Sequence, residues 1–276
     1  MVAKLRQVVE SFALKQKKIM CLLTFSWKKH ADYRLILLAN RDEFYERKTQ
    51  KADFWEENPA ILAGKDLEAG GTWLGIHQNG NFTALTNYRD LKNLKTNAPS
   101  RGKLTLDWLE STDTAPHYLE KIQATASSYN GFNLLIGNLE NLYYFSNYQN
   151  QIRPLEAGIY GLSNHLLDTD WFKVQKLKQN FSESIDKGVD IEVFFSLLKD
   201  SQFPPDQQVQ QTGLSFEMEK MLSPIFLKNP KYGTCCSTVL TIDYNNEVNF
   251  VERNYNAENE DFIEKKFNFR LSQAPL

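Results

Sequence analysis

Long apolar runs and an excess of charge are both missing from this chain of 276 residues. No stretch approaches the roughly eighteen uncharged apolar residues of a membrane-spanning helix. The 32 basic and 34 acidic residues give a formal net charge of −2, whereas nucleic-acid-binding chains usually present a basic face. The sequence therefore predicts no integral membrane segment and no nucleic-acid partner.

Cysteine is scarce, and the three cysteines are Cys21, Cys235 and Cys236. The adjacent pair cannot easily bridge to itself, and no cysteine or histidine has the spacing of a zinc site. A glycine-rich dinucleotide motif and a P-loop are also missing, so we expect neither a metal nor a resident cofactor. Because residues 1–19 lack the apolar stretch of a secretory signal, we expect a cytoplasmic protein with reduced thiols.

The rest of the composition is that of an ordinary globular protein, with 42% hydrophobic and 13% aromatic residues. Runs of β-prone residues between short polar turns predict strands at 20–27, 33–39, 72–78, 81–87, 132–136, 142–145, 159–162, 238–243 and 248–251. Apolar spacings of three and four predict helices at 104–109, 114–126, 171–177, 191–198 and 217–222. Hairpins grouped between helices indicate an α+β fold with antiparallel sheets and helices outside.

The first hairpin places a cysteine beside a polar cluster. If its turn is centred near His30, Cys21 lies opposite Ala39, next to the Asn-Arg-Asp-Glu run at 40–43. Such a cluster at the rim of a sheet is typical of a functional site. The alternative is a solvated strand end with a small apolar cysteine in the sheet.

The second hairpin adds another polar strand end. With Asn-Gly at 79–80 as a two-residue turn, Asn87 is expected opposite Thr72. Asn164 follows the strand predicted at 159–162 in the same way. Either asparagine could donate a hydrogen bond to an oxyanion, or simply satisfy the backbone at a strand end.

The first nineteen residues differ from the rest of the chain. Five basic residues against Glu10 give 1–19 a net charge of +4, so the remainder carries −6. Met20 fits an initiator methionine that is removed before a small residue, which would expose Cys21. We therefore expect 1–19 to be a leader, either a mis-called start or a propeptide, before a single domain at 20–276. The alternative is a real N-terminal helix that precedes an internal cysteine.

A chain that begins at Cys21 would carry a nucleophile and a base in one residue. Its α-amine has a reference pKa of about 7.7–8.0, so it can accept a proton near neutral pH. Its thiol is the adjacent nucleophile, as in the N-terminal variant of covalent catalysis.

Several short motifs occur in order along the chain. They are Met20-Cys21, Leu-Ala-Asn-Arg-Asp-Glu-Phe at 38–44 with Arg47, Gly-Gly-Thr-Trp-Leu-Gly at 70–75, Leu-Thr-Asn-Tyr-Arg at 85–89, Ser-Arg-Gly at 100–102, Gly-Leu-Ser-Asn at 161–164, and Tyr-Gly-Thr at 232–234 with Ser237-Thr238. In combination they closely resemble the signature of the transport and Golgi organisation protein 2 family, also called the NRDE family after its Asn-Arg-Asp-Glu motif.

The resemblance implies an N-terminal nucleophile hydrolase-like fold, a four-layer αββα sandwich of two antiparallel sheets flanked by helices. Penicillin V acylase and bile salt hydrolase have a similar fold and use a cysteine made N-terminal by processing. Matched position by position, the resemblance implies that Cys21 is the nucleophile and that Asp42 orients its amine. Asn87 and Asn164 then match the asparagines that shape the oxyanion hole.

Two positions depart from the pattern. Those hydrolases have an arginine where this chain has Ala39, and Arg41 is the candidate to replace it. Many family members have an arginine where this chain has Cys235. Both departures bear on whether the site works as a standard acylase site.

The leading hypothesis is an enzyme that hydrolyses a non-peptide C–N amide bond of a small or lipidic substrate through a Cys21 thioester. Asn40, Arg41, Trp73 and Arg89 are the substrate-binding candidates. The family is also linked to Golgi organisation, lipid metabolism and haem movement. The alternatives are therefore a haem- or lipid-binding trafficking protein on the same fold, and a structural factor with a degenerate site. The sequence leaves the substrate and the oligomeric state open.

Overall fold

The computed structural model describes residues 20–256 and 261–272, and it contains two antiparallel sheets. The first has the spatial order β10 (Gly158–Leu162), β1 (Met20–Trp27), β2 (Tyr33–Phe44), β11 (Tyr232–Asp243), β12 (Glu247–Tyr255) and β13 (Phe262–Arg270). The second has the order β3 (Thr49–Phe54), β4 (Ile61–Asp66), β5 (Leu74–His77), β6 (Phe82–Asn87), β7 (Phe132–Gly137), β8 (Leu142–Ser146) and β9 (Gln151–Pro154).

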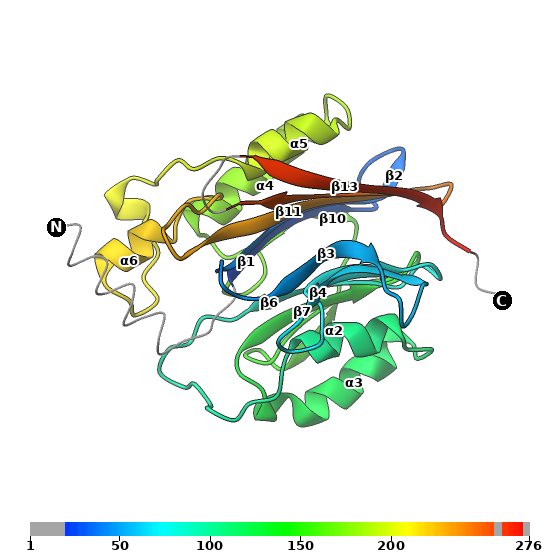
Figure 1. Cartoon of the computed structure of the whole chain (residues 1–276), viewed down its shortest axis with the longest axis horizontal. Coiled ribbons are helices and arrows are strands. Elements are labelled where there is room, and N and C mark those ends of the chain that lie inside the picture. Colours follow the sequence, from blue (N-terminus) through cyan, green and yellow to red (C-terminus); the bar gives the residue numbers. More distant parts are fainter. Residues whose placement is uncertain (1–19, 257–260, 273–276) are drawn as a thin grey trace.

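Helices cover the outer faces of both sheets (Figure 1). The six-stranded sheet packs against α4 (Phe172–Ile185) and α5 (Ile191–Leu198), and the seven-stranded sheet against α2 (Gly102–Leu109) and α3 (Ala115–Thr125). The remaining short helices are η1 (Ala126–Ser128), η2 (Asp206–Gln208) and α6 (Phe216–Met221). The expected α+β fold, a four-layer αββα sandwich, is therefore confirmed. No helix in the described ranges is long and apolar enough to cross a bilayer.

Side-chain alternation along β1 and β2 creates two of the hydrophobic cores. Leu23 and Ala39 point into the core between the sheets, while Leu22 and Leu38 point into the core beneath α4 and α5. Because successive strand residues face opposite sides, both faces of these strands are apolar. This burial on both faces agrees with the position of β1 and β2 in the interior of the six-stranded sheet.

The predicted register of the first hairpin is wrong by two residues. Cys21 pairs with Arg41, and not with Ala39. The reason is a longer turn: Lys28 adopts a positive φ of 47°, and its N–H donates to Arg34 O. The turn is therefore centred beyond His30.

The second hairpin is also offset. Its loop has three residues rather than two, because His77 N–H donates to Asn81 O and Gly80 supplies a positive φ of 97°. Thr72 precedes β5, and the predicted pair between Thr72 and Asn87 does not form. Asn87 pairs instead with Phe132 of β7.

Other differences concern weakly patterned segments. The predicted 171–177 helix continues to Ile185, and four strands had no prediction. Three of them, β3, β9 and β13, are edge strands. Edge strands bury little side-chain surface and show little apolar patterning, so their sequences do not distinguish them from loops. Asp190 caps α5, because its side chain accepts hydrogen bonds from Glu192 N–H and Val193 N–H.

Candidate active site

Cys21 lies near the start of β1, and its register fixes which residues surround it. It pairs with Arg41 of β2, and Arg41 pairs on its other side with Cys236 of β11. Directly paired residues point to the same face of a sheet. Because Leu23 and Ala39 face the second sheet, alternation places the Cys21 thiol and the Arg41 guanidinium on that face.

Asp42 points to the opposite face, toward the α4 layer. It pairs with Met20 in the β1–β2 ladder, one residue from Cys21. Thr234 Oγ1 donates to Asp42 Oδ1 at 2.6 Å, and Tyr232 OH donates to the Asp42 carbonyl at 3.2 Å. No described residue donates a hydrogen bond to the buried Asp42 Oδ2. One carboxylate oxygen therefore remains available beside the start of β1.

Two asparagines from different sheets meet beside Cys21. Asn164 Nδ2 donates to Asn87 O at 3.0 Å. Ser163 Oγ donates to Cys21 O at 3.0 Å, which fixes the turn after β10 against β1. Asn87 ends β6 of the second sheet, so these contacts join the two sheets next to the Cys21 backbone.

The thiol is protonated at neutral pH. Burial raises the pKa of Cys21 to about 12, and the negative charge of Asp42 adds to the shift. The Arg41 guanidinium and a backbone hydrogen bond from Asp42 oppose this shift. A thiol in this state needs an adjacent base before it can act as a nucleophile.

The Asp42 carboxyl is also perturbed. Burial raises its pKa to about 6, while the Lys173 ammonium and the hydrogen bond from Thr234 lower it. At pH 7 the carboxyl is therefore mostly ionised, although the side chain is fully buried.

A cavity of about 540 Å³ opens between the second sheet and the loop that follows β6. Asn87 and Trp73 line it, together with the cations Arg47, Lys95 and Arg101. The Arg41 guanidinium lies 4.3 Å from the Trp73 ring centroid, and Arg41 is not itself among the lining residues. The cavity is mixed in character, with apolar walls and several cationic side chains.

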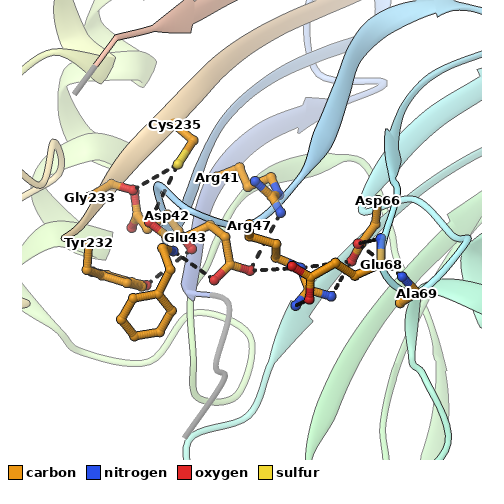
Figure 2. Close-up of polar contacts among 11 residues, drawn as sticks. Arg41, Asp42, Glu43, Arg47, Asp66, Glu68, Ala69, Tyr232, Gly233 and Cys235 are labelled. Atoms are coloured by element: carbon orange, nitrogen blue, oxygen red, sulfur yellow. Dashed lines mark hydrogen bonds and ion pairs between the residues drawn. The ribbon is translucent and has the colours of Figure 1, made fainter. Parts of the chain in front are cut away.

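Figure 2 shows an ion-pair network between the two sheets. Glu43 of β2 lies 3.5 Å from both Arg41 and Arg47. Arg47 also contacts Asp66 of β4 at 2.6 Å and Glu68 at 3.3 Å. The network fixes the acidic end of the NRDE run against the cavity wall.

Two of the expected substrate-binding residues have structural partners instead of a place in the cavity wall. Asn40 Nδ2 donates to Leu198 O and Ile225 O at 2.8 and 2.9 Å. Arg89 forms a buried ion pair with Glu219 at 3.0 Å. Both side chains anchor the helical layer to the strands that carry the candidate site.

The structure locates Ala39 and Cys235, the two residues that depart from the family pattern. Ala39 is buried two residues from Arg41 on the same face of β2, so Arg41 is the arginine that faces Cys21. Cys235 is the extra residue at an irregularity of β11 between Thr234 and Cys236. Its thiol donates to Glu43 O at 3.5 Å (Figure 2).

The sequence patterns predicted no functional role for Lys173 or Arg101. Lys173, on α4, is fully buried, and its charge interacts with those of Asp42 and Cys21. The sequence indicates that Lys173 is buried, because it lies four and eight residues before Leu177 and Phe181 on the apolar stripe of the helix. Arg101 occurs in the Ser-Arg-Gly motif and borders the cavity, and burial lowers its pKa to about 10.

No group of three or more potential metal ligands occurs within 20–256 and 261–272. The described lining of the cavity contains no histidine, cysteine or methionine. His165, close to the asparagines, already uses both ring nitrogens, because Tyr88 OH lies 3.0 Å from Nε2 and Thr169 Oγ1 lies 2.9 Å from Nδ1.

The family model described as Transport and Golgi organisation 2 matches residues 20–257. The Transport and Golgi organization protein 2 homologs of Bos taurus and Homo sapiens are 38% and 37% identical to this chain over 258 residues, covering 85% of it and 92% of each relative. Among solved structures, the Caenorhabditis elegans ortholog of N-acylethanolamine-hydrolyzing acid amidase aligns with a TM-score of 0.47 and 11% identity, covering 80% of this chain and 92% of that one.

Proposed function

This chain belongs to the Transport and Golgi organisation 2 family, and we propose that it is an N-terminal-cysteine hydrolase of non-peptide C–N amide bonds. The observation that carries the proposal is the arrangement at the start of β1. Cys21 faces Arg41 on one side of the sheet, while the unpartnered Oδ2 of Asp42 lies on the other, one residue along. A chain that starts at Cys21 would place its α-amine between them.

The reaction follows from these positions. The neutral α-amine takes the thiol proton as Sγ attacks the substrate carbonyl and a C–S bond forms. In this reaction the side-chain amides of Asn164 and Asn87 stabilise the oxyanion. The C–N bond then breaks, the amine returns the proton to the leaving nitrogen, and a thioester remains. Water hydrolyses the thioester, releases the acid and restores the thiol.

The electrostatics support a base within the same residue. The Cys21 thiol has its pKa raised by burial, so it is not a preformed thiolate. The α-amine, with a reference pKa of about 7.7–8.0, is the nearest group that titrates in the required range. Asp42, ionised above pH 6, accepts hydrogen bonds from that amine and fixes its direction.

The cavity suggests the form of the substrate. Its apolar lining residues, Trp73, Leu85 and Leu94 among them, suit an acyl chain. The haem- or lipid-binding alternative remains a prediction, and haem finds no histidine, cysteine or methionine in the described lining. A haem titration without a Soret shift would count against it.

The test uses a chain expressed from Met20 and a panel of N-acyl amides of increasing acyl length, with amine release as the readout. We expect turnover that Cys21→Ser reduces by about 10⁴-fold or more, as for other nucleophile removals. Cys235→Ala removes a cysteine outside the machinery and serves as the matched control. A hydroxylamine-labile acyl adduct on Cys21 by intact mass would support the thioester, and full turnover by Cys21→Ser would exclude it.

A further inference from the structure

A buried lysine lies beneath the candidate nucleophile, and the proposed reaction does not use it. Lys173 is the second residue of α4 and has no exposed surface. Lysine is almost never fully buried unless it is paired, and a cation in the first turn of a helix opposes the helix dipole. Its side chain therefore carries an energetic cost that packing alone does not explain.

The contacts of Lys173 leave its charge uncompensated by any direct partner. Its Nζ donates to Leu222 O at 3.1 Å, and it forms no ion pair with any carboxylate in the described ranges. The titratable groups that interact with it are Asp42, Arg89, Cys21 and Glu219. Arg89 and Glu219 already pair with one another at 3.0 Å. Asp42 is therefore the carboxylate that balances Lys173.

The surroundings of Asp42 also indicate an electrostatic interaction with Lys173. Besides Lys173 on α4, the titratable groups that interact with it are Arg41 and Glu43 on its own strand, Cys21 on β1, Tyr45 after β2, and Tyr232 and Cys235 on β11. Among them, Lys173 is the strongest influence that favours the ionised carboxylate. Tyr232 on β11 contributes a hydrogen bond to the Asp42 carbonyl.

We propose that Lys173 is a positioning residue for the Cys21 amine: its ammonium keeps the buried Asp42 carboxylate charged without occupying Asp42 Oδ2. A direct salt bridge would consume that oxygen. Because Leu222 O holds the ammonium instead, Lys173 acts on Asp42 through space and leaves the oxygen for the amine. This inference rests on the proposed function, because the proposed function assigns the unpartnered Asp42 Oδ2 to the Cys21 amine.

The first test measures the alkylation of Cys21 by iodoacetamide as a function of pH, resolved by peptide mass spectrometry, in the chain expressed from Met20. We expect Lys173→Met to move the acid midpoint of the reaction upward by about one pH unit, since it removes the charge that keeps Asp42 ionised. Lys176→Met, which removes a half-buried lysine of the same helix that pairs with Asp200, should leave the midpoint unchanged. An unchanged midpoint in folded Lys173→Met would overturn the proposal.

A double-mutant cycle covers the case in which Lys173→Met fails to fold. Asp42→Asn, Lys173→Met and the double variant are compared by urea unfolding in the chain that retains residues 1–20. We expect each single variant to lower the midpoint and the double variant to return it to at least the wild-type value. Purely additive losses would overturn the coupling between the two residues. The cycle could show coupling between Asp42 and Lys173 while alkylation of Cys21 shows no role for the amine. That result would support the electrostatic interaction of the two residues and contradict the proposed function.

Discussion

The two ends of the β1–β2 pair are equally buried and chemically opposite. At the turn end, Trp27, Leu35 and Leu37 are no more than 2% exposed and fill the core between the sheets. At the other end, the Asn-Arg-Asp-Glu run at 40–43 is also no more than 2% exposed. Charges taken out of water cost free energy that apolar residues would not. The comparison indicates that the turn end stabilises the fold, whereas the proposed function gives the charges at the other end a role in the reaction.

The largest effect on stability should come from the turn end. Leu37→Ala removes a side chain from the core between the sheets, and we expect it to lower the free energy of unfolding by about 2–5 kcal/mol. Amide hydrolysis per folded molecule should not change, because Leu37 lies far along the strand from Cys21. Urea unfolding and active-site titration measure the two quantities. A specific loss of turnover in the folded fraction would contradict the division between the ends.

At the charged end we expect a smaller change in the free energy of unfolding, and of opposite sign. The double variant Asp42→Asn with Lys173→Met removes two buried charges, and replacement of buried ion pairs is often stabilising by about 1–4 kcal/mol. We expect a protein at least as stable as the wild type that has lost turnover. If the double variant is instead strongly destabilised, the charges serve the fold and the comparison fails.

The smallest effect is the pH dependence of stability. The pKa of Asp42 is raised in the fold from 3.8 to about 6, so the folded protein binds a proton that the unfolded chain does not between these values. The contribution of Asp42 to the free energy of unfolding therefore rises as pH falls from 6 to 4, by at most about 1.4 kcal/mol per pH unit. Turnover should fall over the same interval. Unfolding of wild type and Asp42→Asn at pH 4–7 measures the difference, and parallel curves would contradict it.

Much of the fold was predictable because its interior strands are strongly patterned. The runs that became β1, β2, β6, β7 and β11 bury at least one face, and their apolar residues follow from that burial. The edge strands β3, β9 and β13 were missed, since half-exposed strands need no such pattern.

The proximity of the candidate site residues was predictable from the sequence, but their geometry was not. Cys21, Asp42, Asn87 and Asn164 do converge at one end of the sandwich, yet their pairing depended on turn lengths. The positive φ of Lys28 and the three-residue loop that ends at Gly80 set both registers. Such turn conformations are decided by local backbone energetics that residue type specifies only loosely.

The central claim concerns residues 1–19, which lie outside the described part of the chain. Their predicted role as a leader makes the free Cys21 amine the decisive group. The most direct measurement compares amide hydrolysis by the full chain and by the chain expressed from Met20, with intact mass to identify each N-terminus. We predict turnover wherever the mass shows Cys21 at the N-terminus, and none where Met20 is retained. Equal turnover by a protein that retains Met20 would contradict the mechanism.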